Sequence, residues 1–364
     1  MKKIMFAITT LTGGGAERVV SVWANMLSKK GYDVSLILYG RENNEYFILN
    51  DVKIYTVADN YVEYKKMGYF KRLSSMKKII KNVKPEIIIN FLPRMQIWMM
   101  MATFGLKVKR IETVRINPWE VIKDDSFFEG FLWKKCFNRA HGIIVQNSEQ
   151  REFFKKKNYK KCVVIPNPLS PVYETIERGE YKSKPKNIIA VGRITEQKNY
   201  PMLIRAMNRI VKEYPELQLS IFGSGREEYL NMLNDMIKEH NLENNIKFKG
   251  RSNEIHKELC SSDLYIMSSD YEGMPNALAE AMASGLVCIS TNCKTGPKDM
   301  IENGENGFLV PVNDDLALYE VVCEIMKMNV DELNKIASNA RRSILDKCSE
   351  EQSVNKLINM IENL

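Results

Sequence analysis

Two cations close to the end of an apolar run are the first residues that could do chemistry. Arg193 follows the run 187–191, and Lys198 lies shortly after it. A planar guanidinium and a flexible ammonium at the carboxyl end of a strand suit the oxygens of a diphosphate. The alternative is an exposed basic turn. A further loop, Gly-Ser-Gly at 223–225, follows the next apolar run and would let a ligand approach the backbone closely.

Two glutamates, Glu272 and Glu280, bound the most specific pattern in the chain. On one continuous helix their spacing would put them about 80° apart, so we expect Glu272 in a loop and Glu280 on a helix. Pro275 favours a helix start between them, and the amides around it could hold phosphate or sugar oxygens. Glu280 could accept hydrogen bonds from the vicinal diol of a ribose. Two solvated glutamates beside a helix start are the alternative.

A glycine-rich segment, 12–18, follows the first apolar run of the chain. Glycines at the amino end of a helix let backbone amides approach an anion, which the helix dipole favours. The segment matches neither a Walker A loop nor a dinucleotide-binding loop, and a tight turn is the alternative. With the two patterns above, it gives the candidate residues for binding a ligand with phosphate and sugar groups: Gly14, Gly15, Gly223, Gly273, Met274, Pro275, Asn276, Ala277 and Glu280.

Val- and Ile-rich runs alternate with segments of helical periodicity along the chain. This order predicts an α/β fold of parallel sheets covered by helices on both faces. A polar, proline-containing stretch interrupts the pattern, so we expect two Rossmann-like, doubly wound parallel-sheet domains: residues 1–168, a linker at 169–186, and residues 187–345. A last helix in 346–364 could pack back on the first domain. Ligands of such sheets bind beyond the carboxyl ends of the strands, which predicts a site in a cleft between the domains.

Basic residues are concentrated in the first half of the chain. Eight lysines and arginines and no acid occur within 65–84, largely on a helix expected at 70–83, and a second cluster occurs within 155–161. A short helix is expected over 148–157, capped by Ser148. Such clusters favour an anionic partner, whether phosphate, nucleic acid or lipid headgroups. A solvated basic face is the alternative.

The composition excludes several classes of protein. Hydrophobic residues make up 45% and charged residues 27%, which is typical of a globular protein and not of collagen, disorder or a coiled coil. The seven cysteines are scattered and the three histidines form no cluster, which argues against a disulfide framework and a metal site. No apolar run reaches the roughly 18 residues of a spanning helix. We therefore expect a cytoplasmic protein that is soluble or lies on the inner face of the membrane.

The motifs resemble those of the retaining glycosyltransferases of family 4. The resemblance rests on G-G-A-E-R near residue 15, V-G-R with its following lysine, G-S-G, S-x-x-E-G-x-P through Glu280, and G-x-x-G-x-x-V at 304–310. It implies the GT-B arrangement, in which two Rossmann-like domains face each other across a cleft. It also implies that Arg193 and Lys198 hold the donor diphosphate, that Glu272 lies near the donor sugar and that Glu280 lies on the ribose. Arg193, Lys198 and Glu272 are therefore the candidate catalytic residues.

The first domain departs from this family in one respect. Many members carry a histidine after a middle strand, whereas the corresponding segment 113–118 has none. Arg115 or Asn117 would then take its sugar-contacting role. Together with Glu17 and Arg94, these two residues are the candidates for contacts with the acceptor or the sugar.

The expected function is transfer of a sugar from a UDP-linked donor to an acceptor hydroxyl with retention. The expected acceptor is a lipid-linked or polysaccharide glycan of bacterial surface polysaccharide assembly, met at the anionic inner membrane surface. No metal or other cofactor is expected, because the chain lacks an Asp-x-Asp motif and its cations and amides would stabilise the diphosphate. The alternatives are a nucleotide-sugar epimerase of the same fold and a basic nucleic-acid-binding protein. No base-reading motif is recognisable, so no nucleic-acid partner is expected.

Overall fold

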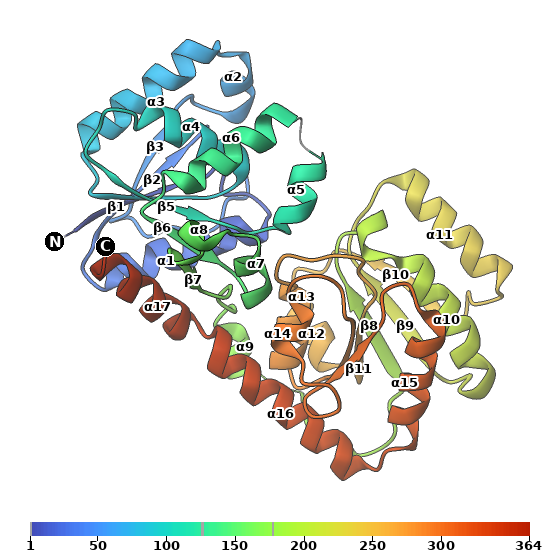
Figure 1. Cartoon of the computed structure of the whole chain (residues 1–364). Coiled ribbons are helices and arrows are strands. Elements are labelled where there is room, and N and C mark those ends of the chain that lie inside the picture. The colour runs from blue at the N-terminus through green and yellow to red at the C-terminus, as the bar shows by residue number, and fades with distance from the viewer. Residues whose placement is uncertain (1, 125–126, 177) are drawn as a thin grey trace. The chain divides into compact units, whose positions relative to one another are not determined.

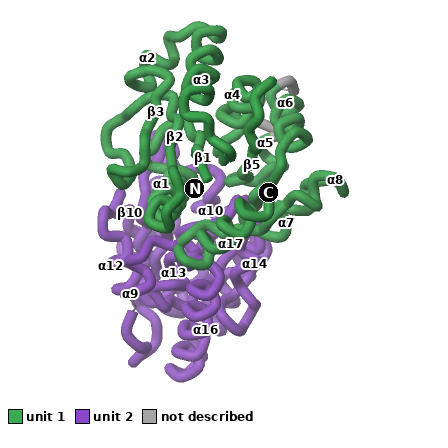
Figure 2. The backbone as a smooth tube through the Cα atoms, turned by 90° about the vertical axis from the view of Figure 1, so that its left-hand side faces the viewer, with its two compact units in different colours: residues 1–168, 350–364 green, residues 169–349 purple. Residues whose placement is uncertain are grey.

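The computed structural model describes residues 2–124, 127–176 and 178–364. The chain forms two compact units, shown in different colours in Figure 2. Unit 1 comprises residues 1–168 and 350–364, and unit 2 comprises residues 169–349. Each unit is built on one parallel sheet, so the predicted fold class of two doubly wound parallel-sheet domains is confirmed.

Unit 1 contains a sheet in the order β3-β2-β1-β4-β5-β6-β7. Its strands are β1 (Lys3–Ala7), β2 (Asp33–Leu38), β3 (Lys53–Thr56), β4 (Ile87–Asn90), β5 (Lys109–Thr113), β6 (Gly142–Val145) and β7 (Cys162–Val164). Its helices are α1 (Gly15–Lys29), α2 (Tyr61–Lys66), α3 (Tyr69–Val83), α4 (Pro93–Ala102), α5 (Pro118–Asp124), α6 (Phe127–Asn138), α7 (Ser148–Glu152), α8 (Lys156–Tyr159) and α17 (Glu350–Glu362).

Helices cover both faces of this sheet because successive residues of each buried strand point to opposite sides. In β1, Ile4 and Phe6 pack in the core beside α1 and α17, whereas Met5 and Ala7 pack beside α3 and α4. The helix α17 follows unit 2 in sequence but lies on unit 1 (Figure 1). The indole Nε1 of Trp23 in α1 donates a hydrogen bond to Ser353 Oγ of α17 at 2.9 Å.

Unit 2 contains a sheet in the order β10-β9-β8-β11-β12-β13. Its strands are β8 (Asn187–Val191), β9 (Gln218–Phe222), β10 (Ile246–Gly250), β11 (Leu264–Met267), β12 (Val287–Thr291) and β13 (Phe308–Val310). Its helices are α9 (Val172–Thr175), the short 3-10 helix η1 (Glu196–Lys198), α10 (Tyr200–Glu213), α11 (Glu227–Glu239), α12 (Ile255–Cys260), α13 (Asn276–Ala283), α14 (Pro297–Met300), α15 (Asp315–Lys327) and α16 (Val330–Cys348).

The segment 169–186, expected as a linker, is part of unit 2 in the structure. Leu169, Tyr173 and Tyr181 are buried there. The backbone N–H of Leu169 donates to the carbonyl of Cys348 at 2.8 Å, so the start and the end of unit 2 are joined directly.

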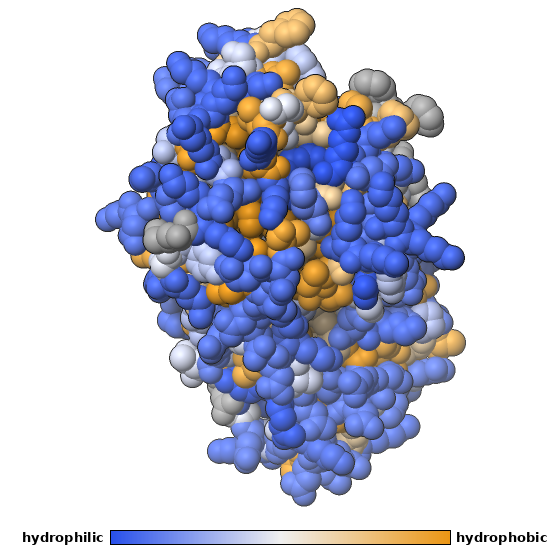
Figure 3. Space-filling view, turned by 60° about the vertical axis from the view of Figure 1, so that its left-hand side comes forward, coloured by the Kyte–Doolittle hydropathy of each residue, from blue (hydrophilic) through white to orange (hydrophobic). Residues whose placement is uncertain are grey.

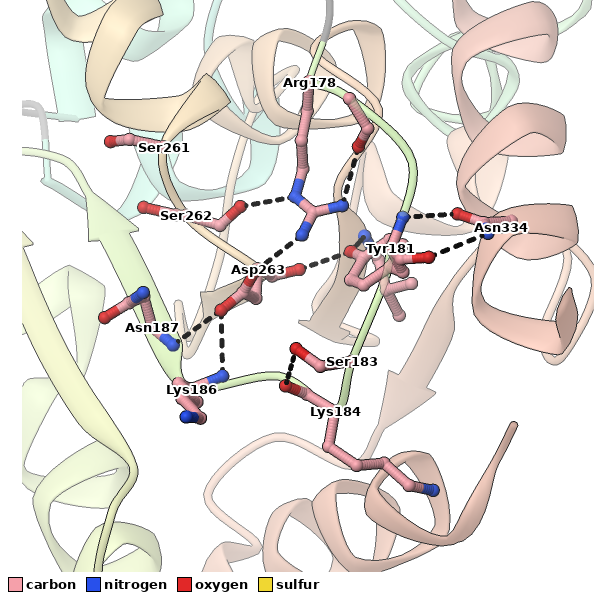
Figure 4. A network of polar contacts seen from close by, with 12 residues as sticks. Arg178, Tyr181, Ser183, Lys184, Lys186, Asn187, Ser261, Ser262, Asp263 and Asn334 are labelled. Atoms are coloured by element: carbon pink, nitrogen blue, oxygen red, sulfur yellow. Dashed lines mark hydrogen bonds and ion pairs between the residues drawn. The ribbon is translucent and has the colours of Figure 1, made fainter. Parts of the chain in front are cut away.

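Asp263 fixes the last part of this segment in front of β8 (Figure 4). Its carboxylate accepts hydrogen bonds from the Arg178 guanidinium at 2.6 Å and from the backbone N–H groups of Lys186 and Asn187 at 2.8 and 2.9 Å. The guanidinium also stacks on the ring of Tyr181, 3.6 Å from its centroid. These contacts hold together the amino ends of β8 and β11, the two strands whose carboxyl ends carry the candidate site.

Several local expectations need correction. The helices α2 and α5 were not predicted, and the helix expected over 148–157 is two short helices, α7 and α8. Asn147, not Ser148, caps α7, because its side chain accepts from the N–H of Gln150. Among the helices of the described ranges, none has the length and apolar character needed to cross a membrane.

Candidate active site

The sheet of unit 2 changes direction between β8 and β11. From β8 the chain continues to β9 on one side, and it later returns to β11 on the other. In open α/β sheets the loops beyond such a switch point are the usual position of a ligand. Lys198 follows β8 and Glu272 follows β11, so the fold brings these two predicted residues to one edge of the sheet.

Lys198 and Glu272 form an ion pair at this switch point. The Nζ of Lys198 lies 2.7 Å from Oε1 of Glu272, and the same oxygen accepts a hydrogen bond from Ser269 Oγ at 2.7 Å. Ser268 Oγ donates to the backbone carbonyl of Lys198 at 2.7 Å, which anchors the turn that carries the lysine. The side chains of the pair are only 14% and 10% exposed. An ammonium has three donors, so Lys198 can hold this glutamate and an anionic ligand together.

Close backbone contact between two loops explains the glycines of this edge. A Cβ on Gly223 would lie 1.8 Å from the carbonyl oxygen of Gly192, and a Cβ on Gly192 would lie 2.9 Å from Cε of Lys198. Gly223 also has a φ of 155°, which other residues rarely adopt. Arg193 follows Gly192 and is exposed.

The second loop of the site leads from Glu272 to α13. Glu280 lies on α13 and is 8% exposed, whereas Glu272 lies in the loop before it. The hydroxyl of Thr295 donates to the backbone carbonyl of Glu272. A Cβ on Gly296 would lie 2.6 Å from Cδ of Pro275. Gly273, Met274, Asn276 and Ala277 are therefore placed by the loop after β12 as well as by their own helix.

Thr295 and Gly296 were not predicted as site residues. The available signal was a Thr-Gly-Pro sequence at 295–297, shortly after the run 287–291. Both residues have positive φ angles, 66° for Thr295 and 105° for Gly296. This backbone turns the loop after β12 towards Pro275.

In unit 1 the sheet changes direction between β1 and β4. The glycine loop follows β1, but a Cβ on Gly14 would lie 2.0 Å from Oε2 of Glu17, so this carboxyl group lies against the amino end of its own helix. Burial raises the pKa of Glu17. A ligand anion at Gly14 and Gly15 would have to displace Glu17. Arg94 follows β4, is 75% exposed, and lies 3.9 Å from Glu129.

Arg115 lies beyond the carboxyl end of β5 and is buried. Its guanidinium carbon is 4.6 Å from the ring of Trp23 and 5.2 Å from that of Phe91, and its Nη1 donates to Asn167 Oδ1 at 2.8 Å. Burial lowers its pKa. Within the described ranges, its Nε and Nη2 and the Nδ2 of Asn117 have no hydrogen-bond partner.

A buried acid in β5 was also missed. Glu112 is fully buried, and its Oε1 lies 3.1 Å from Arg110 Nη1 and accepts from Asn90 Nδ2 at 3.2 Å. Burial raises the pKa of Glu112 to about 7. The signal was the placement of Arg110 and Glu112 two residues apart in this strand, which puts opposite charges on the same face of the sheet. In the part of the chain that the structure describes, no group of three or more His, Cys, Asp or Glu residues is placed to hold a metal ion.

Comparison with known proteins assigns the family. The family model described as Glycosyl transferases group 1 matches residues 173–343, and that described as Glycosyltransferase Family 4 matches residues 13–172. A relative in Haemophilus influenzae, described as an uncharacterized glycosyltransferase, is 30% identical over 325 residues, which cover 86% of this chain and 87% of the relative. The chain belongs to the group 1 (family 4) glycosyltransferases.

Two further similarities of this glycosyltransferase span nearly its whole length. A Campylobacter jejuni enzyme is 25% identical over 352 residues, 95% of this chain and 94% of its own. That enzyme is described as a GalNAc-alpha-(1->4)-GalNAc-alpha-(1->3)-diNAcBac-PP-undecaprenol alpha-1,4-N-acetyl-D-galactosaminyltransferase. The crystal structure of Anabaena HepE in complex with UDP and glucose matches with a TM-score of 0.81 and 17% identity, covering 100% of both chains. The predicted family and the predicted GT-B type of fold are confirmed.

Proposed function

We propose that this glycosyltransferase moves a sugar from a UDP-linked donor to a hydroxyl of a lipid-linked or polysaccharide glycan, with retention of the anomeric configuration. The observation that carries the proposal is the buried Lys198–Glu272 pair at the switch point of unit 2, with Arg193 on the same turn. UDP in the HepE structure supports the donor, and the undecaprenol-linked acceptor of the Campylobacter jejuni relative supports the acceptor. Bacterial surface polysaccharide assembly is the proposed setting.

The proposed chemistry places developing negative charge where the cations are. The bond between the anomeric carbon and the diphosphate oxygen breaks, and a bond from that carbon to the acceptor oxygen forms. Arg193 and Lys198 stabilise the leaving diphosphate, which is electrostatic catalysis in a partly dehydrated site. Glu272 holds the ammonium of Lys198 in place and faces the sugar, and Glu280 accepts hydrogen bonds from the ribose. The resemblance to the retaining enzymes of family 4 supports retention.

A divalent ion is not part of the proposed mechanism. Magnesium-type ions that assist diphosphate departure are held by carboxylate oxygens converging on the phosphates. The carboxylate of Glu272 at the candidate phosphate site already accepts from an ammonium and a hydroxyl. The positive charges of Lys198 and Arg193 would stabilise the leaving diphosphate in place of a metal ion.

A panel of nucleotide sugars tests the donor and the acceptor. Release of nucleoside diphosphate is measured with each donor, with and without a bacterial membrane lipid extract, and each reaction is repeated with excess EDTA. We expect acceptor-dependent release of UDP that survives EDTA, and a product whose anomeric signals in NMR match the configuration of the donor.

Each part of the proposal has its own contrary outcome. Conversion of a nucleotide sugar without any acceptor would identify an epimerase. Loss of activity in EDTA with recovery in magnesium or manganese would contradict the metal-free mechanism, and an inverted product would contradict retention. For variants of Lys198 and Arg193 in the same assays, the exposed Lys212 on α10 provides the matched control, since Lys212→Ala should leave all these activities unchanged.

A further inference from the structure

One end of unit 1 combines exposed aromatic side chains with a dense group of lysines. The exposed apolar residues are Val62 at 62%, Tyr69 at 50%, Phe70 at 84%, Phe104 at 69% and Phe131 at 49%. They come from α2, α3, the turn after α4, and α6. In the space-filling view, hydrophobic side chains reach the surface at the upper end of the molecule among hydrophilic ones (Figure 3). We call these five residues and the basic residues around them the aromatic-basic face.

Direct contacts connect the α3 and α4 parts of this face. The ring of Tyr69 lies 4.6 Å from that of Trp98 and 5.9 Å from that of Phe70, and its hydroxyl lies 2.8 Å from Sδ of Met101. The Nζ of Lys77 on α3 donates to the backbone carbonyl of Phe104 at 3.0 Å. The two helices therefore present one continuous surface.

Cation–π contacts extend the face to α6. The guanidinium of Arg139 lies 5.9 Å from the ring of Phe104, and the Nζ of Lys135 lies 5.0 Å from the ring of Phe131. Phe131 and Lys135 are four residues apart on α6 and so share one side of it, and Arg139 directly follows the end of this helix. Basic groups thus lie directly beside the exposed rings.

The charge of α2 and α3 is strongly positive. Glu63 is the single acid within residues 61–84, against eight lysines and arginines. On α3 the exposed positions include Phe70, Lys71, Lys78 and Lys81, whereas Met76 and Ile80 are buried on the opposite side of the helix. The solvent-exposed side of α3 therefore carries its lysines and the ring of Phe70.

We propose that the aromatic-basic face docks on the surface of an anionic lipid bilayer. Aromatic side chains favour the boundary between headgroups and acyl chains, and lysines near anionic headgroups are attracted by the surface potential. A solvated basic face would need no exposed phenylalanines, and an apolar protein partner would not account for the excess of positive charge. The proposal does not depend on the proposed transferase reaction, because it concerns binding alone.

Vesicle sedimentation with the full chain tests the proposal. The probes are vesicles of phosphatidylcholine alone and vesicles of phosphatidylcholine mixed with phosphatidylglycerol, without any nucleotide sugar. We expect binding to the mixed vesicles and weak or no binding to the neutral ones. Raising the salt to about 1 M shortens the Debye length to about 3 Å and should weaken the binding strongly.

Paired variants separate the apolar and the basic contributions. Phe70→Ser with Phe104→Ser should lower the partition coefficient by about tenfold per side chain at every salt concentration. Lys71→Ala with Lys78→Ala should lower it by about fivefold per lysine at low salt and change it little at high salt. The control variants change residues at or beside α1. Phe47→Ser removes an exposed phenylalanine whose backbone carbonyl accepts a hydrogen bond from Ser21 of α1. Lys29→Ala with Lys30→Ala removes two exposed lysines at the end of α1.

The proposal is overturned if the wild-type chain does not bind the mixed vesicles at low salt. It is also overturned if the control variants lose as much binding as the variants of the aromatic-basic face. Equal binding to neutral and anionic vesicles would also overturn it. Thermal unfolding of each variant shows that the fold is kept, as expected for exposed positions. Loss of transferase activity with normal vesicle binding would affect the proposed function and not this inference.

Discussion

Lys198 and Glu272 are distant in the sequence, yet their side chains form a largely buried ion pair, with 2.7 Å between Nζ and Oε1. Burying either charge alone would be costly, because a charge in a low-dielectric site needs a partner. The pair therefore keeps a cation in a partly dehydrated position before any ligand arrives. A preorganised cation of this kind stabilises developing charge without reorganising during the reaction.

Replacing either predicted phosphate-binding cation should lower catalysis. Arg193 is exposed, so its replacement should leave stability unchanged, whereas Lys198→Ala should also lower stability because it removes the ion-pair partner of the buried Glu272 carboxylate. We expect Lys198→Ala and Arg193→Ala each to reduce kcat/KM by about 10²–10³, the cost of removing one group that stabilises transition-state charge. Steady-state release of nucleoside diphosphate measures the effect. Lys212→Ala is the control, and near wild-type turnover of either site variant would remove that residue from the diphosphate site.

Glu112 should make the stability of unit 1 depend on pH. Its folded-state pKa of about 7 lies above the ordinary value of 4.5, so between these values the folded chain holds a proton that the unfolded chain releases. The contribution of this residue to stability is therefore full below about pH 4.5 and is lost as the pH rises towards 7, by up to about 1.4 kcal/mol per pH unit.

The variant Glu112→Gln removes this titration and keeps the size of the side chain. The difference in free energy of unfolding between wild type and variant should shift against the wild type as the pH rises from about 4.5 to 7, and then level off. Denaturant unfolding at a series of pH values measures it. A difference that is constant across this range would show that Glu112 does not change its protonation there.

Individual site residues could be predicted where chemistry and position coincide in the sequence. Arg193, Lys198 and Glu272 follow apolar runs within a few residues, so their place at the edge of a sheet could be inferred. The contact between Glu17 and Gly14 could not, because it depends on the rotamer that Glu17 adopts in the first turn of α1. The burial of Arg115 could not, because it depends on how side chains from separate elements pack. Thr295 and Gly296 were missed because their effect passes through the backbone of another loop.

At the scale of elements, the loops after β8 and β9 hold each other through their backbones. The N–H of Ile194 donates to the carbonyl of Ser224 at 2.9 Å, and Gly192 N–H donates to the carbonyl of Phe222 at 3.0 Å. The turn that carries Arg193 and Lys198 is thus positioned by the glycine loop of the neighbouring strand. This arrangement requires the absence of a side chain at Gly223.

The substitution Gly223→Ala should disturb both stability and the site. Its Cβ would lie 1.8 Å from the carbonyl oxygen of Gly192, so one of the two loops must move. We expect a lower melting temperature and a fall in kcat/KM, measured on the same preparation. Gly285→Ala is the matched control, because Gly285 also has a positive φ of 82° but no atom within 4 Å of the added Cβ.

The control separates backbone strain from the clash. Gly285→Ala should cost about 1 kcal/mol of stability through its φ angle alone and leave kcat/KM unchanged. Equal effects of the two substitutions on activity would show that the contact between the two glycine loops does not position the site.

The order and type of most strands and helices could be predicted, because apolar runs and helical periodicity are strong signals in a doubly wound fold. The helix α2 was missed, since its six residues offer too few turns for a periodic pattern. The cap of α7 was placed one residue late, because Asn147 and Ser148 are both good capping residues and only the geometry distinguishes them.

At the scale of the whole molecule, the last helix completes a core that the first residues of the chain begin. Val354, Leu357 and Ile361 of α17 are fully buried in the same cluster as Trp23 and Ile4. Unit 1 is therefore closed by residues that follow unit 2 in the chain. Sequence periodicity predicted a helix there and could only suggest where it packs, because an amphipathic helix does not specify its partner.

Shortening one buried side chain of α17 should accordingly destabilise unit 1 and not unit 2. Leu357→Ala is expected to cost about 2–5 kcal/mol, because Leu357 is fully buried and its removal leaves a cavity. All four tryptophans of the chain lie within residues 23–133, so tryptophan fluorescence reports unfolding of unit 1 alone. The denaturant midpoint of fluorescence should fall, while the part of the circular dichroism signal that comes from unit 2 keeps its midpoint. Asn355→Ala on the exposed side of α17 is the control, and an unchanged fluorescence midpoint for Leu357→Ala would mean that α17 does not complete the core of unit 1 in solution.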